Sequence, residues 1–169
     1  MVFDLDPSTG DFEPVRETAA ALHEMLESAK VPCFLKTSGS RGLHIVVPLK
    51  ADAGYGEVHA AAHHVATLLV AGSPKTRTLE FLKSNRHGRV FIDVNRNAYA
   101  QTYAAAFGVR ARARAPVSFP SDWSELREKD FRPDGVTIAT VFERLDEDPW
   151  AGLTRRAVSC ETIRRRLGG

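Results

Sequence analysis

Residues 34–47 read Phe-Leu-Lys-Thr-Ser-Gly-Ser-Arg-Gly-Leu-His-Ile-Val-Val, two short apolar runs separated by a turn that contains Gly39 and Gly42. Each run has the length and composition of a buried strand, and the glycines favour a reversal of the chain between them. Because the connection is too short for a crossover between parallel strands, the two strands are predicted to pair antiparallel. A doubly wound parallel sheet is therefore disfavoured.

The segments around this hairpin show strand and helix patterns of their own. Apolar residues recur at helical spacing between Val15 and Ala29, and alanine is frequent between Tyr55 and Val70. The predicted elements are, in chain order, a strand at residues 2–6, a helix at 15–29, strands at 34–36 and 43–47, a helix at 55–70, a strand at 90–92, and short helices near 123–126 and 138–145. This order predicts an α+β domain with a mostly antiparallel sheet.

The composition is that of one soluble globular domain. The chain has 169 residues, of which 43% are hydrophobic and 26% charged, and no apolar run reaches the length that crosses a bilayer. The first residues show no basic leader followed by an apolar stretch, and Cys33 and Cys160 form neither a CxxC pair nor a disulfide framework. These features predict a single domain over residues 1–169, a cytoplasmic location and no membrane contact.

Three aspartates lie at the ends of predicted strands. Asp4 and Asp6 flank Leu5, and alternate residues of a strand point to the same face, so both carboxylates are predicted to face one spot. Adjacent carboxylates repel unless a cation lies between them, and oxygen ligands suit Mg²⁺ or Mn²⁺. Asp93 follows another apolar strand, and three carboxylates can hold two cations about 3.5–4 Å apart, as in phosphoryl transfer. An exposed Asp-Pro turn and a capping aspartate are the alternative interpretations.

The turn between the two central strands is rich in groups that bind phosphate. Its glycines expose backbone N–H groups, and Lys36, Ser38, Arg41 and His44 add charged or hydrogen-bonding side chains. No Gly-Lys-Ser/Thr sequence follows, so a P-loop ATPase is disfavoured. A triphosphate-binding loop is favoured over a glycine hairpin that only turns the chain.

Arginines are unevenly distributed, although the net charge is only +2. Those that bracket Asp93 in the sequence are Arg86, Arg89, Arg96 and Arg110. They are predicted either to grip phosphate oxygens or to neutralise the carboxylates. Further arginines alternate after residue 109 and gather at 155–166, where phosphate contacts and a solvated helix face are equally good interpretations. The aromatics Phe81, Phe91, Phe107, Trp123 and Trp150 have apolar neighbours and are predicted to lie in the core.

Four segments in this order resemble the motifs of a known family. They are Val-Phe-Asp-Leu-Asp-Pro at 2–7, Phe-Leu-Lys-Thr-Ser-Gly-Ser-Arg-Gly-Leu-His at 34–44, Arg-Val-Phe-Ile-Asp-Val-Asn-Arg-Asn at 89–97, and Val-Arg-Ala-Arg at 109–112. The chain resembles the polymerase domain of bacterial DNA ligase D, in the archaeo-eukaryotic primase superfamily. The resemblance implies an RRM-like, mostly antiparallel sheet with packed helices, the catalytic core of a primase-polymerase.

The resemblance also implies roles for individual residues. Asp4, Asp6 and Asp93 match the catalytic, metal-binding triad, and the matching nucleotide-binding residues are Lys36, Ser38, Gly39, His44, Arg86, Arg96 and Arg110. The implied reaction is the metal-dependent addition of an NTP or dNTP to a DNA 3′-OH during end-joining repair or priming, with Mn²⁺ or Mg²⁺ in a two-metal site. DNA ends, a ligase and an end-binding protein are the implied partners, and the nucleoid of a bacterial cytoplasm is the implied location.

The family has a substantial region before its first acidic motif, whereas Met1 lies almost on that motif here. The chain is therefore expected to be the metal- and triphosphate-binding half of the domain with a C-terminal helical extension, and weak or absent activity in isolation is left open. One alternative is a haloacid-dehalogenase-type Mg²⁺-dependent phosphatase, because Asp4-x-Asp6-x-Ser8 nearly fits its opening motif. The other is a non-catalytic nucleic-acid-binding remnant of a primase-polymerase domain.

Overall fold

The computed structural model describes residues 1–168 and contains a six-stranded sheet, a two-stranded ladder and three α-helices within that range. The helices and strands are β1 (Val2–Asp6), α1 (Glu13–Ser28), β2 (Phe34–Thr37), β3 (Leu43–Val46), α2 (Tyr55–Gly72), β4 (Arg77–Thr78), β5 (Val90–Asp93), β6 (Gly108–Val109), β7 (Val117–Ser118), β8 (Pro120–Ser121) and α3 (Cys160–Arg166). Single 3₁₀ turns are η1 (Lys83–Asn85), η2 (Asn95–Asn97), η3 (Glu125–Arg127), η4 (Val141–Arg144) and η5 (Thr154–Arg156).

The main sheet has the strand order β4-β5-β1-β3-β2-β8. Its pairings are antiparallel except for β4 with β5, which is parallel. The predicted antiparallel hairpin of β2 and β3 is confirmed, with Leu35 opposite Ile45. The α+β class with a mostly antiparallel sheet is therefore confirmed.

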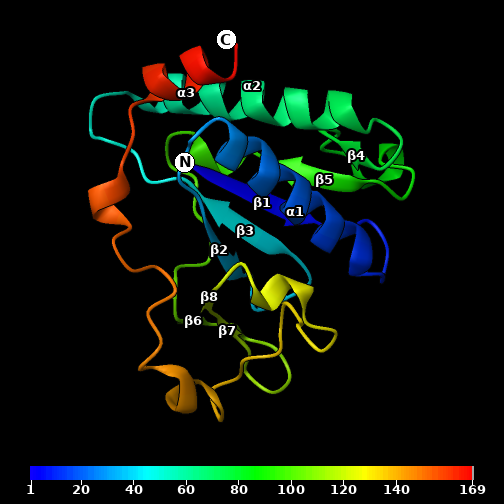
Figure 1. Cartoon of the computed structure of the whole chain (residues 1–169). Coiled ribbons are helices and arrows are strands. Elements are labelled where there is room, and N and C mark those ends of the chain that lie inside the picture. The colour runs from blue at the N-terminus through cyan, green and yellow to red at the C-terminus, as the bar shows by residue number, and fades with distance from the viewer. Residues whose placement is uncertain (169) are drawn as a thin grey trace.

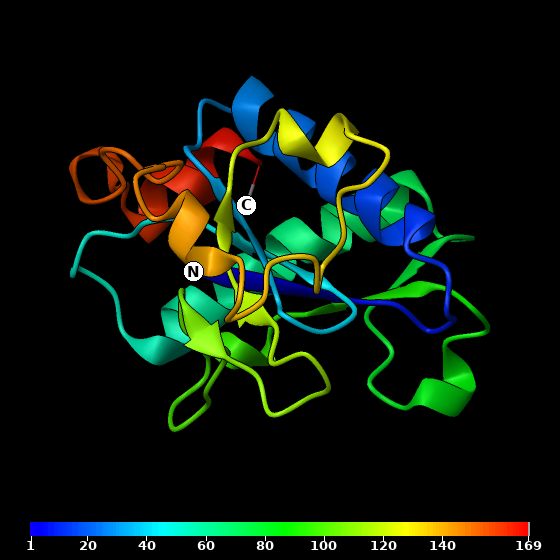
Figure 2. The same cartoon turned by 90° about the horizontal axis from the view of Figure 1, so that it is seen from below.

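The helices cover one face of this sheet. Contacts join α1 to β1, β3 and β5, and α2 to β1 and β4, while α3 packs on α2 (Figure 1). Seen from below, the green to yellow-green segment of residues 98–118 lies on the other side of the sheet from α1 (Figure 2). The sheet thus has a helix-covered face and a second face that is approached by loops and by the short β6–β7 ladder.

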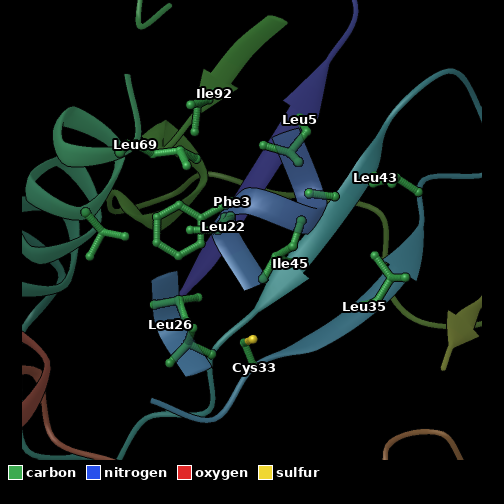
Figure 3. Close-up of a cluster of buried hydrophobic side chains, with 14 of the residues drawn as sticks. Phe3, Leu5, Leu22, Leu26, Cys33, Leu35, Leu43, Ile45, Leu69 and Ile92 are labelled. Carbon is green, nitrogen blue, oxygen red and sulfur yellow. The ribbon is translucent and has the colours of Figure 1, made fainter. Parts of the chain in front are cut away.

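The core lies between the sheet and α1 and α2. Phe3, Leu5, Ile45 and Ile92 point from the strands towards Leu22 and Leu26 of α1 and Leu69 of α2, as Figure 3 shows. These side chains are essentially excluded from water, and full burial of a leucine contributes about 1.5–3 kcal/mol. Because side chains alternate along a strand, the neighbours of these core residues must point to the face away from the helices.

Several sequence predictions need correction outside the core. The short helices predicted near 123–126 and 138–145 are only the 3₁₀ turns η3 and η4. Strands β4, β6, β7 and β8 were not predicted, because two residues are too few to show a period. Phe81 and Phe107 are 67% and 49% exposed, so their prediction as core residues is wrong. No helix within residues 1–168 combines the length and apolarity that a bilayer crossing requires.

Candidate active site

The register of the sheet places four polar side chains in one row across four strands. Asp4 of β1 lies opposite Asp93 of β5 and opposite His44 of β3, and His44 lies opposite Lys36 of β2. Directly opposed residues of an antiparallel pair point to the same face. The row therefore lies on the face away from the core residue Leu5, and all four of its residues are buried.

Asp4 is held in its ionised form by its neighbours in and beside this row. Its Oδ1 lies 3.3 Å from His44 Nε2, and its Oδ2 lies 3.6 Å from Arg96 Nε. Burial acts to raise the pKa of Asp4, but the hydrogen bond with His44 and the positive charges of His44, Arg96 and Lys36 outweigh it and hold the pKa below its ordinary value. A buried aspartate with a lowered pKa is a carboxylate that stays available as an anion.

Asp93 shares the same arginine. Its Oδ2 lies 3.3 Å from Arg96 Nε, and its Oδ1 accepts a hydrogen bond of 2.8 Å from the backbone N–H of Asn95. Arg96 therefore lies between Asp4 and Asp93 and bridges the two strands that carry them. A guanidinium nitrogen of Arg96 also points to the carbonyl of Thr102 at 3.4 Å, in the loop that covers this face.

Asp6 lies two residues along β1 on the same face, opposite Phe91. Burial and the negative charges of Asp4 and Asp93 raise its pKa, against the positive charge of Arg86. The guanidinium of Arg86 lies 4.0 Å from the centre of the Phe91 ring. The prediction that Asp4 and Asp6 share one face of β1 is confirmed by the register, and Asp93 of the neighbouring strand lies on that face as well.

The turn between β2 and β3 is closed by Ser38. Its Oγ accepts hydrogen bonds from the backbone N–H groups of Ser40 and Gly42 at 3.2 and 3.1 Å. Gly39 has a φ of +65°, and a Cβ there would lie 2.7 Å from Arg110 Cγ and 3.0 Å from the backbone N of Ser118. Gly39 is thus required by its backbone conformation and by the close passage of Arg110 over the turn.

These groups border a pocket of about 450 Å³ on the face away from the helices. Its lining residues are Asp4, Asp6, Ser38, Ser40, Arg41, His44, Arg96, Thr102, Tyr103, Ala104, Arg110 and Arg112. The pocket is thus lined both by carboxylates and by several arginines, a combination that suits a cation together with an anion. A larger hollow of about 670 Å³ next to it shares Ser40 and Arg41, but it contains none of the predicted site residues and is lined by charges of both signs.

The structure brings most of the predicted site residues to this pocket but leaves some outside it. Asp93 lies behind Arg96, and Arg86 lies beyond Asp6, where its guanidinium donates to the carbonyls of Glu80 and Phe81 at 3.0 and 2.7 Å. Lys36 has no exposed surface, and its Nζ donates to the Ser118 hydroxyl and, at 3.2 Å, to the carbonyl of Thr37. Lys36 is therefore not open to the pocket, and its hydrogen bonds instead hold the segment around Ser118 against the end of β2.

Sequence reasoning missed Tyr103 and Ser118 as parts of the site. The Tyr103 ring meets the His44 ring edge-on with 5.9 Å between centroids, and Ser118 Oγ donates to the carbonyl of Thr37 at 2.8 Å. Tyr103 lies in an irregular loop with no periodic pattern, so only its aromatic character could have drawn notice. Ser118 ends the segment Ala-Pro-Val-Ser at 115–118, onto which the resemblance of the fourth motif continues, but no role was predicted for it.

The buried Lys36 predicts a specific dependence of stability on pH. Burial lowers its pKa to about 7, against the attraction of Asp4, whereas the ordinary value is 10.5. Between these pH values the unfolded chain binds a proton that the folded protein lacks, so the free energy of unfolding should rise with pH. Below pH 7 the lysine is charged in both states and contributes no slope.

The difference between the wild type and Lys36→Met isolates this effect. Urea unfolding at a series of pH values should show the wild type gaining stability relative to Lys36→Met from about pH 7 upward. Methionine retains the unbranched shape without the charge, and titrating groups remote from residue 36 contribute equally to both profiles. Two pH profiles that stay parallel would contradict a lysine held with a depressed pKa.

The carboxylates suit a divalent cation by their chemistry. Asp4, Asp6 and Asp93 share a face, and carboxylate oxygens are the ligands that Mg²⁺ and Mn²⁺ prefer. The Arg96 guanidinium lies between Asp4 and Asp93. Within residues 1–168, no group of three or more His, Cys, Asp or Glu side chains has the geometry of a metal site. The three carboxylates thus share a face by chemistry and register but do not converge on one point, and Arg96 lies between two of them.

Comparison with known proteins adds independent information. A family model described as the primase-polymerase domain of LigD matches residues 1–150. The multifunctional non-homologous end joining protein LigD of Pseudomonas aeruginosa is 33% identical over 175 residues, which cover 99% of this chain and 21% of that protein. The corresponding LigD of Mycobacterium tuberculosis is 34% identical over 157 residues, covering 88% of this chain and 21% of that protein.

A solved structure agrees with these sequence relatives. The polymerase domain from Mycobacterium tuberculosis ligase D in complex with DNA superimposes with a TM-score of 0.84 at 32% identity, covering 93% of this chain and 55% of that one. This chain therefore spans about a fifth of the length of the curated relatives and about half of the matched structure.

Proposed function

Since the chain belongs to the family of LigD primase-polymerase domains, we propose that it is a metal-dependent nucleotidyltransferase that adds a nucleotide to a DNA 3′-OH in end-joining repair or priming. The observation that carries the proposal is the row of Asp93, Asp4 and His44 beside a pocket that several arginines also line. The transfer of a nucleotidyl group needs both halves of this arrangement, a site for a cation and a site for a triphosphate.

The arginines of the pocket suit the triphosphate. The pocket is lined by Arg41, Arg96, Arg110 and Arg112. A guanidinium can bind phosphate oxygens through two parallel hydrogen bonds. His44 Nδ1 is buried and finds no hydrogen-bond partner within residues 1–168, which supports a role for this ring in binding a ligand. An unsatisfied buried polar atom costs about 1–3 kcal/mol, a cost that a bound phosphate oxygen would remove.

The three carboxylates suit the divalent cation. Asp4, Asp6 and Asp93 would hold Mn²⁺ or Mg²⁺, and ions bound there would lower the pKa of the attacking 3′-OH and neutralise the phosphates. His44 contributes by keeping Asp4 ionised, through the contact of 3.3 Å between Nε2 and Oδ1. Ser38 contributes by fixing the turn that carries the arginine side of the pocket.

The substrates and partners follow from the relatives and are part of the proposal. The similar proteins are named for non-homologous end joining, and the matched polymerase domain was solved in complex with DNA. DNA ends and an NTP or dNTP are therefore proposed as substrates, and a ligase and an end-binding protein as partners, in the cytoplasm at the nucleoid. The family membership displaces the haloacid-dehalogenase-type phosphatase as an alternative.

Calorimetry of ATP binding tests the proposal. ATP is titrated into the protein with Mn²⁺ and again with EDTA, for the wild type, for Asp4→Asn/Asp6→Asn, and for Asp130→Asn/Asp146→Asn as a control with the same loss of charge at exposed positions. Binding should require Mn²⁺, should be lost in the first double variant and should persist in the control. Binding that ignores Mn²⁺ and survives in all three proteins would instead support a non-catalytic nucleic-acid-binding module.

A further inference from the structure

Arg96 occupies the space that the proposed function assigns to a cation. Both Asp4 and Asp93 have one oxygen held by the protein and the other facing Arg96. Asp4 Oδ1 lies at 3.3 Å from His44, and Asp93 Oδ1 accepts from the N–H of Asn95 at 2.8 Å. The remaining Oδ2 atoms lie 3.6 and 3.3 Å from Arg96 Nε. The positive charge between these carboxylates is thus supplied by the chain itself.

The backbone that carries Arg96 is firmly held. Asn97, in the same 3₁₀ turn, accepts a hydrogen bond from the N–H of Val2 at 2.7 Å and donates to the carbonyls of Val2 and Val94 at 2.8 Å each. These bonds tie η2 to the start of β1. The Arg96 Cα is therefore fixed near both aspartates, whereas its side chain is held by the two ion pairs and by a hydrogen bond of 3.4 Å from Nη1 to the carbonyl of Thr102.

The side chain of Arg96 is held less tightly than its backbone. Arg96 Nε is buried yet forms no hydrogen bond with either aspartate, and its contacts with them are 3.6 and 3.3 Å long. Charge-assisted Arg–carboxylate bonds are usually about 2.7–2.9 Å long, which is shorter than both contacts here. The side chain is 34% exposed and lines the pocket. Arg96 thus neutralises the carboxylates without being locked to them.

We propose that Arg96 is an internal counter-ion that competes with the divalent cation for Asp4 and Asp93, and that an anion in the pocket relieves this competition by taking up the displaced guanidinium. This inference rests on the proposed function, because it presupposes the metal site. Its consequence is that the metal alone binds weakly and that the metal and a phosphate-like anion bind cooperatively. The coupling is reciprocal, as any linkage between two binding equilibria must be.

Titration with Mn²⁺ alone, followed by calorimetry, tests the competition. Arg96→Gln should bind Mn²⁺ about tenfold more tightly than the wild type, within the range usual for coupled sites. Arg112→Gln removes an equal charge from the wall of the same pocket and should change the affinity by much less, because Arg112 makes no ion pair with Asp4 or Asp93 within residues 1–168. Arg96→Lys keeps the charge and should stay close to the wild type.

Sulfate then probes the anion side, with sodium chloride of equal ionic strength as its control. Sulfate should raise the Mn²⁺ affinity of the wild type and leave that of Arg96→Gln unchanged. Thermal melting gives a second readout, in which Mn²⁺ should raise the melting temperature more in Arg96→Gln than in the wild type.

Suppose that the wild type shows Mn²⁺-dependent ATP binding and that Asp4→Asn/Asp6→Asn loses it, so that the proposed metal site holds. If Arg96→Gln then binds Mn²⁺ no more tightly than the wild type, the counter-ion role alone is overturned. Absence of Mn²⁺ binding in the wild type and in every variant overturns the proposed metal site, and the counter-ion role with it.

Discussion

Replacement of Asp93 by asparagine should lower the affinity of the proposed site for Mn²⁺ by at least about 100-fold and abolish the proposed metal-dependent nucleotidyl transfer. Loss of a residue that only orients a metal ligand typically costs 10–100-fold in metal affinity or activity, and Asp93 is proposed as a ligand itself. Its Oδ2 faces the same point as Asp4 Oδ2, where Arg96 now lies. Without the Asp93 charge, the cation loses one of the two carboxylates that face each other across β1 and β5.

The asparagine variant should still fold. Asn has the shape of Asp, and its carbonyl oxygen can continue to accept the hydrogen bond from the backbone N–H of Asn95. Asp130→Asn, at an exposed loop position, serves as the matched control. Calorimetry with Mn²⁺ gives the affinity, and primer extension with Mn²⁺ and labelled NTP gives the activity. An Asp93→Asn protein with wild-type Mn²⁺ affinity would remove Asp93 from the proposed metal site.

Replacement of Gly42 by alanine should lower the free energy of unfolding strongly. Overpacking a site usually costs about 1–3 kcal/mol, and the loss at residue 42 should be larger. A Cβ at residue 42 would lie 2.1 Å from the carbonyl oxygen of Leu5 and 3.2 Å from its carbonyl carbon. Both are backbone atoms of β1, so no side chain can rotate out of the way. Strands β1 and β3 would have to separate next to the pair of Leu5 with Leu43, one residue from the pair of Asp4 with His44.

Urea unfolding monitored by circular dichroism measures this effect. Gly56→Ala is the matched control, because a Cβ there meets nothing within 4 Å and the residue lies in α2, where alanine stabilises by roughly 0.5–1 kcal/mol relative to glycine. The expected pattern is a large loss of stability for Gly42→Ala and none for Gly56→Ala. Similar midpoints for the two variants would mean that β1 and β3 tolerate the extra methyl group at the turn.

The two variants act at different levels: Gly42→Ala affects the pairing of the strands, and Asp93→Asn affects the carboxylates that this pairing brings together. Gly42 permits the close pairing of β1 with β3, and that pairing sets His44 beside Asp4. Asp93 acts only once the sheet has formed, because its partner Asp4 is brought opposite by the pairing of β1 with β5. Loss of Gly42 should therefore reduce stability and metal binding together, whereas loss of Asp93 should reduce metal binding alone.

Part of the fold and of the site could be predicted from local sequence. The hairpin of β2 and β3 was predictable because its connection is too short for a crossover, and the inward position of Leu5 followed from alternation along β1. The shared face of Asp4 and Asp6 followed from the same rule. The short strands β6 to β8 and the exposure of Phe81 were not predictable, because they depend on how irregular loops pack against the rest of the protein.

The sequence by itself determined the elements and the chemical groups: an antiparallel hairpin, two helices, and carboxylates, a histidine and arginines at fixed distances along the chain. Only the tertiary structure decided which groups meet. Strand register, a long-range property, put Asp93 opposite Asp4 and left Lys36 buried at the end of the row. The anchoring of η2 by Asn97 placed Arg96 between the two carboxylates. Local patterns constrain the direction of a side chain, whereas its partners depend on how distant segments pack.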